Sequence, residues 1–245
     1  MAKIRADQLV LARGLAESRA RAQALILAGK ILSGTRRIDK PGTPIAEDAP
    51  LALRGEDHPW VSRGGVKLAY ALDHFGLSPA GRVGLDIGAS TGGFTDVLLA
   101  RGAARVHAVD VGHGQLAWKL RQDARVVVHE RTNARHLDTA LIPEAVGVVV
   151  ADASFIGLEI VLPAGLALAA PGAFAVALVK PQFEAGRAGV GKGGIVRDQA
   201  VHDAVCARIA AWWAALPGWR VLGLTPSPIT GAEGNREFLI AASRG

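Results

Sequence analysis

The chain has 245 residues, of which 50% are hydrophobic and 20% are charged, so it can bury a core and global disorder is excluded. One cysteine, Cys206, argues against a disulfide framework, a zinc cluster and a cysteine–histidine nucleophile pair. The first residues, MAKIRADQ, lack the apolar stretch of a signal peptide, so we expect a cytoplasmic protein.

The net charge of +6 is concentrated at the N-terminus. Residues 1–40 hold nine lysines and arginines against three acidic residues, whereas the remainder has nineteen of each sign. A solvated charged surface would give the same composition, but a basic module beside a neutral body favours a nucleic-acid partner. The candidate contacts are six basic residues of this module: Arg5, Arg19, Arg21, Lys30, Arg36 and Arg37.

Residues 1–57 predict a small α+β domain. Asp7 can begin a short helix that Gly14 ends, and Ser18 can cap a second helix that Gly29 ends. Short strands are expected around Ile31, Ile38 and 51–53.

Residues 58–66, HPWVSRGGV, predict a linker, because proline and a glycine pair interrupt regular structure. A helix from about Lys67 to Phe75 then begins a larger domain, residues 67–245. Alternation of strands and helices there predicts an α/β fold with a mostly parallel sheet covered on both faces. The expected strands are 83–87, 105–109, 126–129, 146–151 and 174–179, followed by an antiparallel hairpin of 220–224 and 238–242.

Residues 160–179 form a run of twenty without a charge, which is long enough to span a bilayer. Pro171-Gly172 is a turn signal in its middle, so we expect no membrane span. The predicted alternative is a buried helix, a turn, and a buried strand that ends at Lys180.

A glycine-rich segment, GLDIGASTGGF at residues 84–94, joins a predicted strand to a predicted helix. Glycines let a ligand approach the backbone closely, and the helix N-terminus follows. The next strand ends at Asp110, whose carboxylate can accept hydrogen bonds from ribose hydroxyls. The spacing differs from the dinucleotide pattern G-x-G-x-x-G and favours S-adenosylmethionine, although a purely structural turn is the alternative.

Four ionisable residues stand where the predicted fold would bring them together: Lys67, Asp152, Lys180 and Glu237. Asp152 and Lys180 follow parallel strands, whose ends meet at one edge of the sheet. A lysine after five apolar residues is a candidate for a desolvated amine that acts as a base. Taken alone, each of these residues could equally well form a surface salt bridge instead of taking part in catalysis.

This order of residues resembles the K-D-K-E tetrad of the FtsJ-type ribose 2'-O-methyltransferases, and residues 1–57 resemble an S4 RNA-binding domain. Several strings are similar to the TlyA (hemolysin A) family: WVSRGGVK at 60–67, DIGASTGGFT at 86–95, DVGHGQLAWK at 110–119, ERTNAR at 130–135, DASFI at 152–156, VKPQFE at 179–184 and GNRE at 234–237.

The resemblance implies S-adenosylmethionine-dependent 2'-O-methylation of cytidine in ribosomal RNA, with no metal, and with Lys67, Asp152, Lys180 and Glu237 as the catalytic tetrad. Ribosomal subunits are the implied partners, and no oligomeric state is predicted. The residues that it implies for the cofactor are Gly88, Ala89, Ser90, Gly92, Gly93, Phe94, Asp110, Asn133, Asp152, Ser154 and Phe155.

Two features depart from well-known members. The linker reads His58-Pro-Trp-Val61 instead of Arg-x-Trp-Val, so linker control of cofactor binding is not carried over. The chain ends eight residues after Glu237, which resembles members restricted to the large ribosomal subunit. We therefore expect large-subunit RNA to be the favoured substrate and small-subunit RNA a possible one.

Three other functions fit the sequence less well. A pore-forming protein would need an amphipathic lytic segment, a signal peptide or a membrane span. A ribosome-assembly factor with a degenerate catalytic fold would not need the tetrad and the glycine loop. A small-molecule methyltransferase would not need the basic module.

Overall fold

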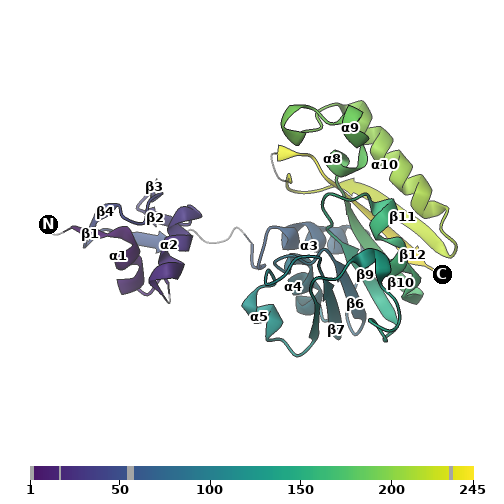
Figure 1. Ribbon diagram of the computed structural model, residues 1–245, viewed down its shortest axis with the longest axis horizontal. Coiled ribbons are helices and arrows are strands. Elements are labelled where there is room, and N and C mark those ends of the chain that lie inside the picture. The colour runs from purple at the N-terminus through teal and green to yellow at the C-terminus, as the bar shows by residue number, and fades with distance from the viewer. Residues whose placement is uncertain (1–2, 17, 54–57, 232–233) are drawn as a thin grey trace. The chain divides into compact units, whose positions relative to one another are not determined.

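The computed structural model describes residues 3–16, 18–53, 58–231 and 234–245. The chain folds as two compact units, Met1–Pro59 and Trp60–Gly245, which we describe separately (Figure 1). The predicted domain boundary at residue 57 falls within 54–57, outside the described residues.

The small unit is a helical pair with two antiparallel sheets, of strand order β1-β4 and β3-β2-β5. Its apolar core includes Leu9, Val10, Ile26 and Ile31. Its elements are β1 (Lys3–Arg5), α1 (Ala6–Ala12), α2 (Arg19–Leu27), β2 (Ile31–Ser33), β3 (Arg36–Arg37), β4 (Pro44–Ala46) and β5 (Leu51–Leu53).

The predicted cap of α2 is confirmed, since the Ser18 hydroxyl accepts a hydrogen bond from the backbone N–H of Arg21. The predicted start of α1 is wrong by one residue, because Asp7 lies inside the helix and Arg5 occupies the cap position. Strand β3 ends just before Ile38. Strands β1 and β4 were not predicted, because they pair with each other across most of the small unit and no local pattern shows that pairing.

The large unit contains a seven-stranded sheet of order β11-β12-β10-β9-β6-β7-β8, in which β10, β9, β6, β7 and β8 are parallel and β12 is antiparallel to its neighbours. The predicted α/β fold with a terminal antiparallel hairpin is confirmed. Its strands are β6 (Val83–Ile87), β7 (Arg105–Val109), β8 (Val126–His129), β9 (Val146–Ala151), β10 (Ala169–Val179), β11 (Trp219–Pro226) and β12 (Phe238–Arg244). Its helices are α3 (Gly64–Phe75), α4 (Gly93–Ala100), α5 (Trp118–Arg121), η1 (Ala134–His136), α6 (Leu158–Val161), α7 (Pro163–Ala167), α8 (Pro181–Glu184), α9 (Gly186–Gly189), η2 (Lys192–Gly194) and α10 (Gln199–Ala214).

Two local expectations were wrong. Pro171-Gly172 is not a turn but lies inside β10, where the register with β9 shifts between Ala169 and Phe174. Proline is tolerated at such an irregularity, where no ladder hydrogen bond is required of it. The uncharged run therefore forms α6, α7 and one long strand, and no helix within the described part of the chain is both long and apolar enough to cross a bilayer.

The glycine pair before Lys67 begins α3 instead of interrupting it. A Cβ atom on Gly65 would lie 2.4 Å from the Trp60 side chain, so glycine allows the helix and the preceding segment to pack closely. The pair thus serves packing within the large unit.

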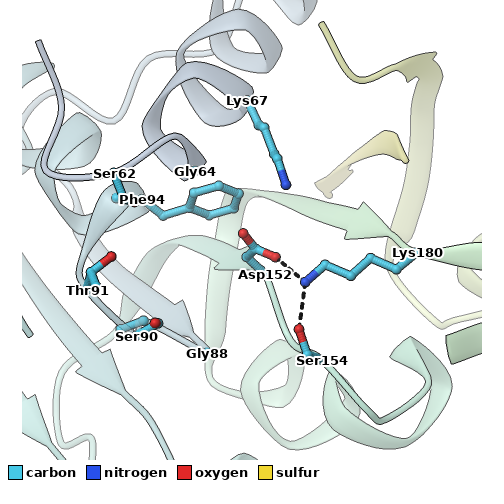
Figure 2. Close-up of a pocket in the computed structure, with 12 residues that line it drawn as sticks. Ser62, Gly64, Lys67, Gly88, Ser90, Thr91, Phe94, Asp152, Ser154 and Lys180 are labelled. Carbon is cyan, nitrogen blue, oxygen red and sulfur yellow. Dashed lines mark hydrogen bonds and ion pairs between the residues drawn. The ribbon is translucent and has the colours of Figure 1, made fainter. Parts of the chain in front are cut away.

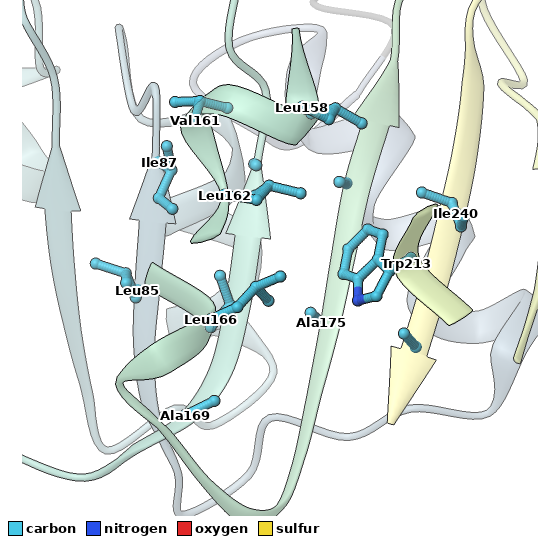
Figure 3. Close-up of a cluster of buried hydrophobic side chains, with 14 of the residues drawn as sticks. Leu85, Ile87, Leu158, Val161, Leu162, Leu166, Ala169, Ala175, Trp213 and Ile240 are labelled. Carbon is cyan, nitrogen blue, oxygen red and sulfur yellow. The ribbon is translucent and has the colours of Figure 1, made fainter. Parts of the chain in front are cut away.

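The sheet buries both of its faces, which is why its strands read as continuous apolar runs. On β10, Ala175, Ala177 and Val179 enter one core, and Phe174, Val176 and Leu178 enter the other. Helices α6, α7 and α10 cover the first face, where Trp213 lies beside Ala175 and Ile240 (Figure 3). Helices α3 and α4 cover the second.

A buried carboxylate joins β6 to α4 across the glycine-rich segment. Asp86 is fully buried, and its Oδ2 accepts hydrogen bonds from the Thr95 N–H (2.9 Å) and Thr95 Oγ1 (2.7 Å). Burial raises the pKa of Asp86 to about 7, although the Thr95 hydrogen bonds oppose the shift.

This raised pKa predicts a pH-dependent stability. Because folded Asp86 holds its proton more tightly than an unfolded aspartate, the folded state loses stability as pH rises from about 4 to about 7. Asp86→Asn should remove this loss, whose upper limit is about 4 kcal/mol for three pKa units. Urea denaturation of both proteins from pH 4.5 to 7.5 measures it, and a difference between them that is constant with pH would contradict the assignment.

Candidate functional site

The carboxyl ends of four parallel strands meet at one edge of the sheet. The glycine-rich segment follows β6, Asp110 follows β7, Asp152 follows β9 and Lys180 follows β10. This edge is where open α/β sheets bind ligands.

The loop between β6 and α4, residues 88–92, requires its glycines. Gly88 has φ 81°, and a Cβ there would lie 2.9 Å from the carbonyl oxygen of Asp152. Gly92 has φ 95°, and a Cβ there would lie 2.3 Å from Leu120 Cδ1. Ser90 adopts φ 48° without being glycine, a strained conformation of the kind that gathers at functional sites.

Asp110 closes one side of a cavity of about 560 Å³, a volume within the range of small-molecule sites. Its carboxylate accepts hydrogen bonds from the N–H groups of Ser90 (2.8 Å) and Gly112 (2.6 Å), which fix both the loop and the carboxylate. The cavity is lined by Ile87, Gly88, Ser90, Val109, Asp110, Val111, Gln115, Thr132, Asn133, Ala134, Arg135, Asp152, Ala153, Ser154, Phe155, Ile156 and Val161.

Lys67, Asp152, Lys180 and Glu237 form two ion pairs, which we call the lysine–carboxylate cluster. Lys180 Nζ lies 2.5 Å from Asp152 Oδ1 and donates to Ser154 Oγ at 2.9 Å (Figure 2). Lys67 Nζ lies 2.5 Å from Glu237 Oε2. Both lysines are buried, at 7% and 8% exposure, so each amine faces a carboxylate rather than bulk water.

A second cavity, of about 190 Å³, lies between the glycine loop and this cluster. It shares Gly88, Ser90, Asp152 and Ser154 with the larger cavity, so the two hollows adjoin. Figure 2 shows the amines of Lys67 and Lys180 on the side of this cavity opposite Ser90 and Thr91. The full lining is Ser62, Gly64, Lys67, Gly88, Ala89, Ser90, Thr91, Gly93, Phe94, Asp152, Ser154 and Lys180.

The structure brings most of the predicted site residues to these two cavities, but two lie behind them. Gly92 lies against Leu116 and Leu120, on the side of the loop away from the cavities. Glu237 does not line either cavity and accepts a hydrogen bond from Lys67, which does. Phe155 is 90% exposed with φ 64°, and its ring lies 4.8 Å from that of Phe183.

Several lining residues were not predicted. Gln115, which accepts a hydrogen bond from Ser90 Oγ at 3.1 Å, lies within the string at 110–119, and that string was the available signal. Ser62 lies in the predicted linker yet lines the smaller cavity, and the neighbouring Val61 N–H donates to Asp96 Oδ2 at 2.8 Å. Thr132 and Arg135 lie within the string at 130–135, which was likewise the available signal.

The predicted RNA contacts of the small unit are all on its surface or partly exposed. Arg5 and Arg19 both pair with Asp7, and Arg37 pairs with Asp39. Arg21 and Arg36 are exposed, and Lys30 is partly buried.

Sequence comparisons divide the chain in the same two parts. The family model described as FtsJ-like methyltransferase matches residues 60–244. The model described as S4 domain matches residues 4–49.

Individual relatives agree. A proposed rRNA methyltransferase of Bacillus subtilis is 51% identical, covering 97% of this chain and 85% of the relative. The 16S/23S rRNA (cytidine-2'-O)-methyltransferase TlyA of Mycobacterium tuberculosis is 48% identical, covering 97% and 89%. The 23S rRNA (cytidine-2'-O)-methyltransferase TlyA of Campylobacter jejuni is 33% identical, covering 73% and 69%.

Among solved structures, a proposed hemolysin from Streptococcus thermophilus is 45% identical with a TM-score of 0.76, covering all of this chain and 89% of that one. The match extends over both units of the sequence. With these relatives and an S4 domain at its N-terminus, the chain belongs to the TlyA branch of the FtsJ-like methyltransferase family.

Proposed function

We propose that this protein transfers a methyl group from S-adenosylmethionine to the ribose 2'-hydroxyl of cytidine in ribosomal RNA. The observation that carries the proposal is the pair of adjoining cavities, one bordered by the Asp110 carboxylate and the other by two buried lysines. Relatives named as rRNA (cytidine-2'-O)-methyltransferases supply the substrate class. Ribosomal RNA as substrate assigns the protein to the cytoplasm.

The residues present fit S-adenosylmethionine. The Asp110 carboxylate accepts hydrogen bonds from two backbone N–H groups and also lines the cavity. Its remaining lone pairs can accept hydrogen bonds from ribose hydroxyls. A side chain at position 88 would fill the space beside the backbone of Asp152, which Gly88 leaves open. We assign the larger cavity to the nucleoside and the smaller one to the end that carries the methyl group.

The proposed chemistry rests on the lysine–carboxylate cluster. S-adenosylmethionine, when bound, would supply an electrophilic sulfonium methyl group, and the leaving group would be a neutral thioether, so the reaction needs no metal. The neutral amine of Lys180 takes the proton from the attacking 2'-hydroxyl, and Asp152 and Ser154 hold the resulting ammonium group in place. Lys67, fixed by Glu237, places a positive charge beside the oxygen as it loses its proton.

RNA binding is proposed for the small unit. Its six predicted contact residues, Arg5, Arg19, Arg21, Lys30, Arg36 and Arg37, supply positive charge for phosphate contacts. We further propose that large-subunit RNA is the favoured substrate, because the TlyA relatives of Mycobacterium tuberculosis and Campylobacter jejuni both carry 23S rRNA in their names, whereas 16S rRNA stands only in the first of these names.

The cofactor assignment predicts a loss of binding. Asp110→Ala should weaken S-adenosylmethionine binding by about 1–3 kcal/mol, the usual value for a charge-assisted hydrogen bond. Titration calorimetry measures it, with Asp73→Ala as the control, because the Asp73 carboxylate pairs with Arg101 at the exposed surface. Equal affinity of Asp110→Ala and the parent protein would show that Asp110 does not hold the ribose.

The base assignment predicts a kinetic defect. Lys180→Ala should lower the methylation rate by at least about 10²-fold, since general-base assistance is worth 10²–10⁴-fold. Lys180→Arg should not rescue the rate, because a guanidinium stays protonated and cannot accept the proton. Single-turnover rates with saturating RNA decide between the roles. A Lys180→Arg enzyme of near-normal rate would reduce Lys180 to a fixed positive charge.

The substrate assignment predicts which subunit is labelled. Tritiated methyl groups should enter the RNA of isolated large subunits, at cytidine 2'-oxygens, and enter small subunits little. Nuclease digestion followed by mass spectrometry identifies the modified nucleoside. Equal incorporation into both subunits would overturn the subunit preference, and base-methylated products would overturn the proposed reaction.

A further inference from the structure

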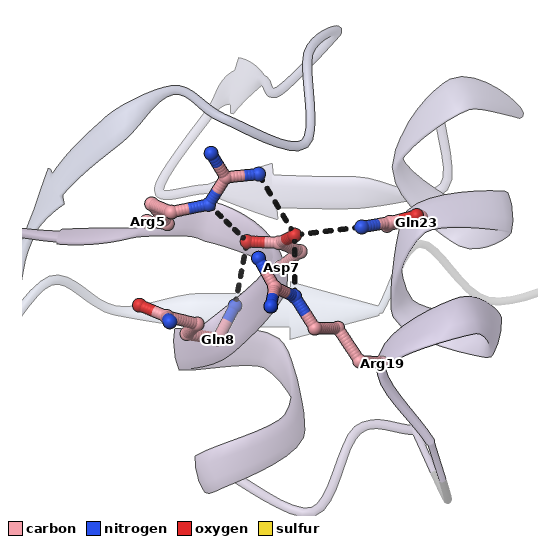
Figure 4. A network of polar contacts seen from close by, with 5 residues as sticks. All are labelled: Arg5, Asp7, Gln8, Arg19 and Gln23. Carbon is pink, nitrogen blue, oxygen red and sulfur yellow. Dashed lines mark hydrogen bonds and ion pairs between the residues drawn. The ribbon is translucent and has the colours of Figure 1, made fainter.

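Asp7 is a fully buried carboxylate in the small unit, at 0% exposure. Its Oδ1 accepts hydrogen bonds from Arg5 Nε (3.0 Å) and the Gln8 N–H (3.1 Å). Its Oδ2 accepts from Arg5 Nη2 (3.0 Å), Arg19 Nε (3.0 Å) and Gln23 Nε2 (2.9 Å), as Figure 4 shows. Five hydrogen bonds therefore converge on one side chain.

The two arginines reach Asp7 from different elements, β1 and the first turn of α2. Their side chains are 48% and 50% exposed, so each guanidinium has one edge on the carboxylate and the rest toward solvent. Within the described residues, Arg5 Nη1 and both terminal nitrogens of Arg19 have no other acceptor. These N–H groups remain free to bind an anion.

The carboxylate stays ionised under ordinary conditions. Hydrogen bonding from the Arg5 guanidinium, above all, holds the pKa of Asp7 well below its usual range, and Gln23 and Arg19 act in the same direction. The negative charge of Asp7 offsets the repulsion between two neighbouring guanidinium groups. Arg5 and Arg19 can therefore stand close together before any phosphate is bound.

We infer that Asp7 is a positioning residue for RNA binding: it holds Arg5 and Arg19 at a fixed spacing so that their free edges grip phosphate groups. The inference rests on the proposed RNA-binding role of the small unit. An immobilised arginine fork binds phosphate with defined geometry, and the entropy of ordering its side chain has already been lost in folding. Asp7 thus strengthens the binding of a polyanion although it is itself an anion.

Two effects of removing this charge oppose each other. Asp7→Asn removes one negative charge and so raises the net charge of the protein by one, and general electrostatic attraction would then tighten RNA binding. Loss of positioning frees two long side chains and weakens binding instead. The sign of the change in affinity therefore distinguishes positioning from general attraction.

Asp39 offers a matched control in the same unit. It pairs with Arg37 two residues away, at 2.5 Å between Arg37 Nε and Asp39 Oδ1, but both side chains are 60% exposed. An exposed ion pair does little to fix the positions of its side chains. Asp39→Asn removes the same negative charge but breaks an exposed ion pair instead of the buried hydrogen bonds of Asp7.

The experiment measures binding of the full-length protein to a large-subunit rRNA transcript by fluorescence anisotropy at several salt concentrations. We expect Asp7→Asn to raise Kd by about 5–100-fold, the equivalent of ordering two long side chains. Asp39→Asn should leave Kd unchanged or lower it. Asp7→Asn binding as tightly as the parent protein would overturn the inference, whereas a parent protein without salt-dependent RNA binding would overturn the proposed function instead.

A double-mutant cycle separates positioning from general damage to the fold. In the Arg5→Ala, Arg19→Ala background, Asp7→Asn should cause no further loss of affinity, because Asp7 acts through these arginines. A further loss of the same size would show a structural role only and overturn the inference. Circular dichroism follows folding of each variant.

If Asp7→Asn unfolds the small unit, Arg19→Lys gives a second test at unchanged net charge. Lysine keeps the positive charge but lacks the planar fork, so binding should weaken several-fold. Equal binding of Arg19→Lys and the parent protein would overturn the inference.

Discussion

Two buried lysines, each of which needs a carboxylate within hydrogen-bond distance, set the constraint on which the site depends. Lys180 meets Asp152, and Lys67 meets Glu237, each at 2.5 Å. Removing one partner of a buried ion pair leaves an uncompensated charge and costs roughly 3–5 kcal/mol. The ends of β9 and β10, the start of α3 and the segment before β12 must therefore come together in the folded protein.

The sheet order satisfies this constraint. Strand β10 lies between β9 and β12, so Lys180, at its end, stands between Asp152 and the segment that carries Glu237. A Cβ atom on Gly231 would lie 2.1 Å from Glu237 Oε1, which shows how closely the backbone approaches that carboxylate. The antiparallel strand β12 thus delivers a carboxylate to an edge that parallel strands alone would leave to loops.

Much of the fold followed from short-range patterns. Strand–helix alternation predicted the parallel sheet, and the position of Lys180 after an apolar strand predicted its burial. What the patterns lacked was information on partners. Nothing in the sequence near Lys67 indicates that Glu237, 170 residues away, rather than Asp152, would face it.

The other misses have equally local causes. Pro171-Gly172 reads as a turn by composition, but it lies at an irregularity of β10, between the β9 pairs of Ala169 and Phe174, and only these long-range pairs show that one strand continues through it. Gly64-Gly65 reads as a helix breaker, and only the packing of Trp60 against Gly65 reveals why a helix begins with glycine. Ser62 lines the smaller cavity because the neighbouring Val61 N–H is hydrogen-bonded to Asp96, a long-range contact that no local pattern indicates.

Both units use a carboxylate to hold cationic side chains, but the exposure of those side chains differs. In the small unit, Asp7 is buried while Arg5 and Arg19 remain half exposed, which suits a large polyanion that approaches from solvent. In the large unit, Lys67 and Lys180 are themselves more than nine-tenths buried and face a cavity of only about 190 Å³. The burial of these two lysines strengthens their charge interactions with Asp152 and Glu237. Under the proposed function, the same pairing of cation and carboxylate would bind a polymer where the cation is exposed and would act on a single hydroxyl where it is buried.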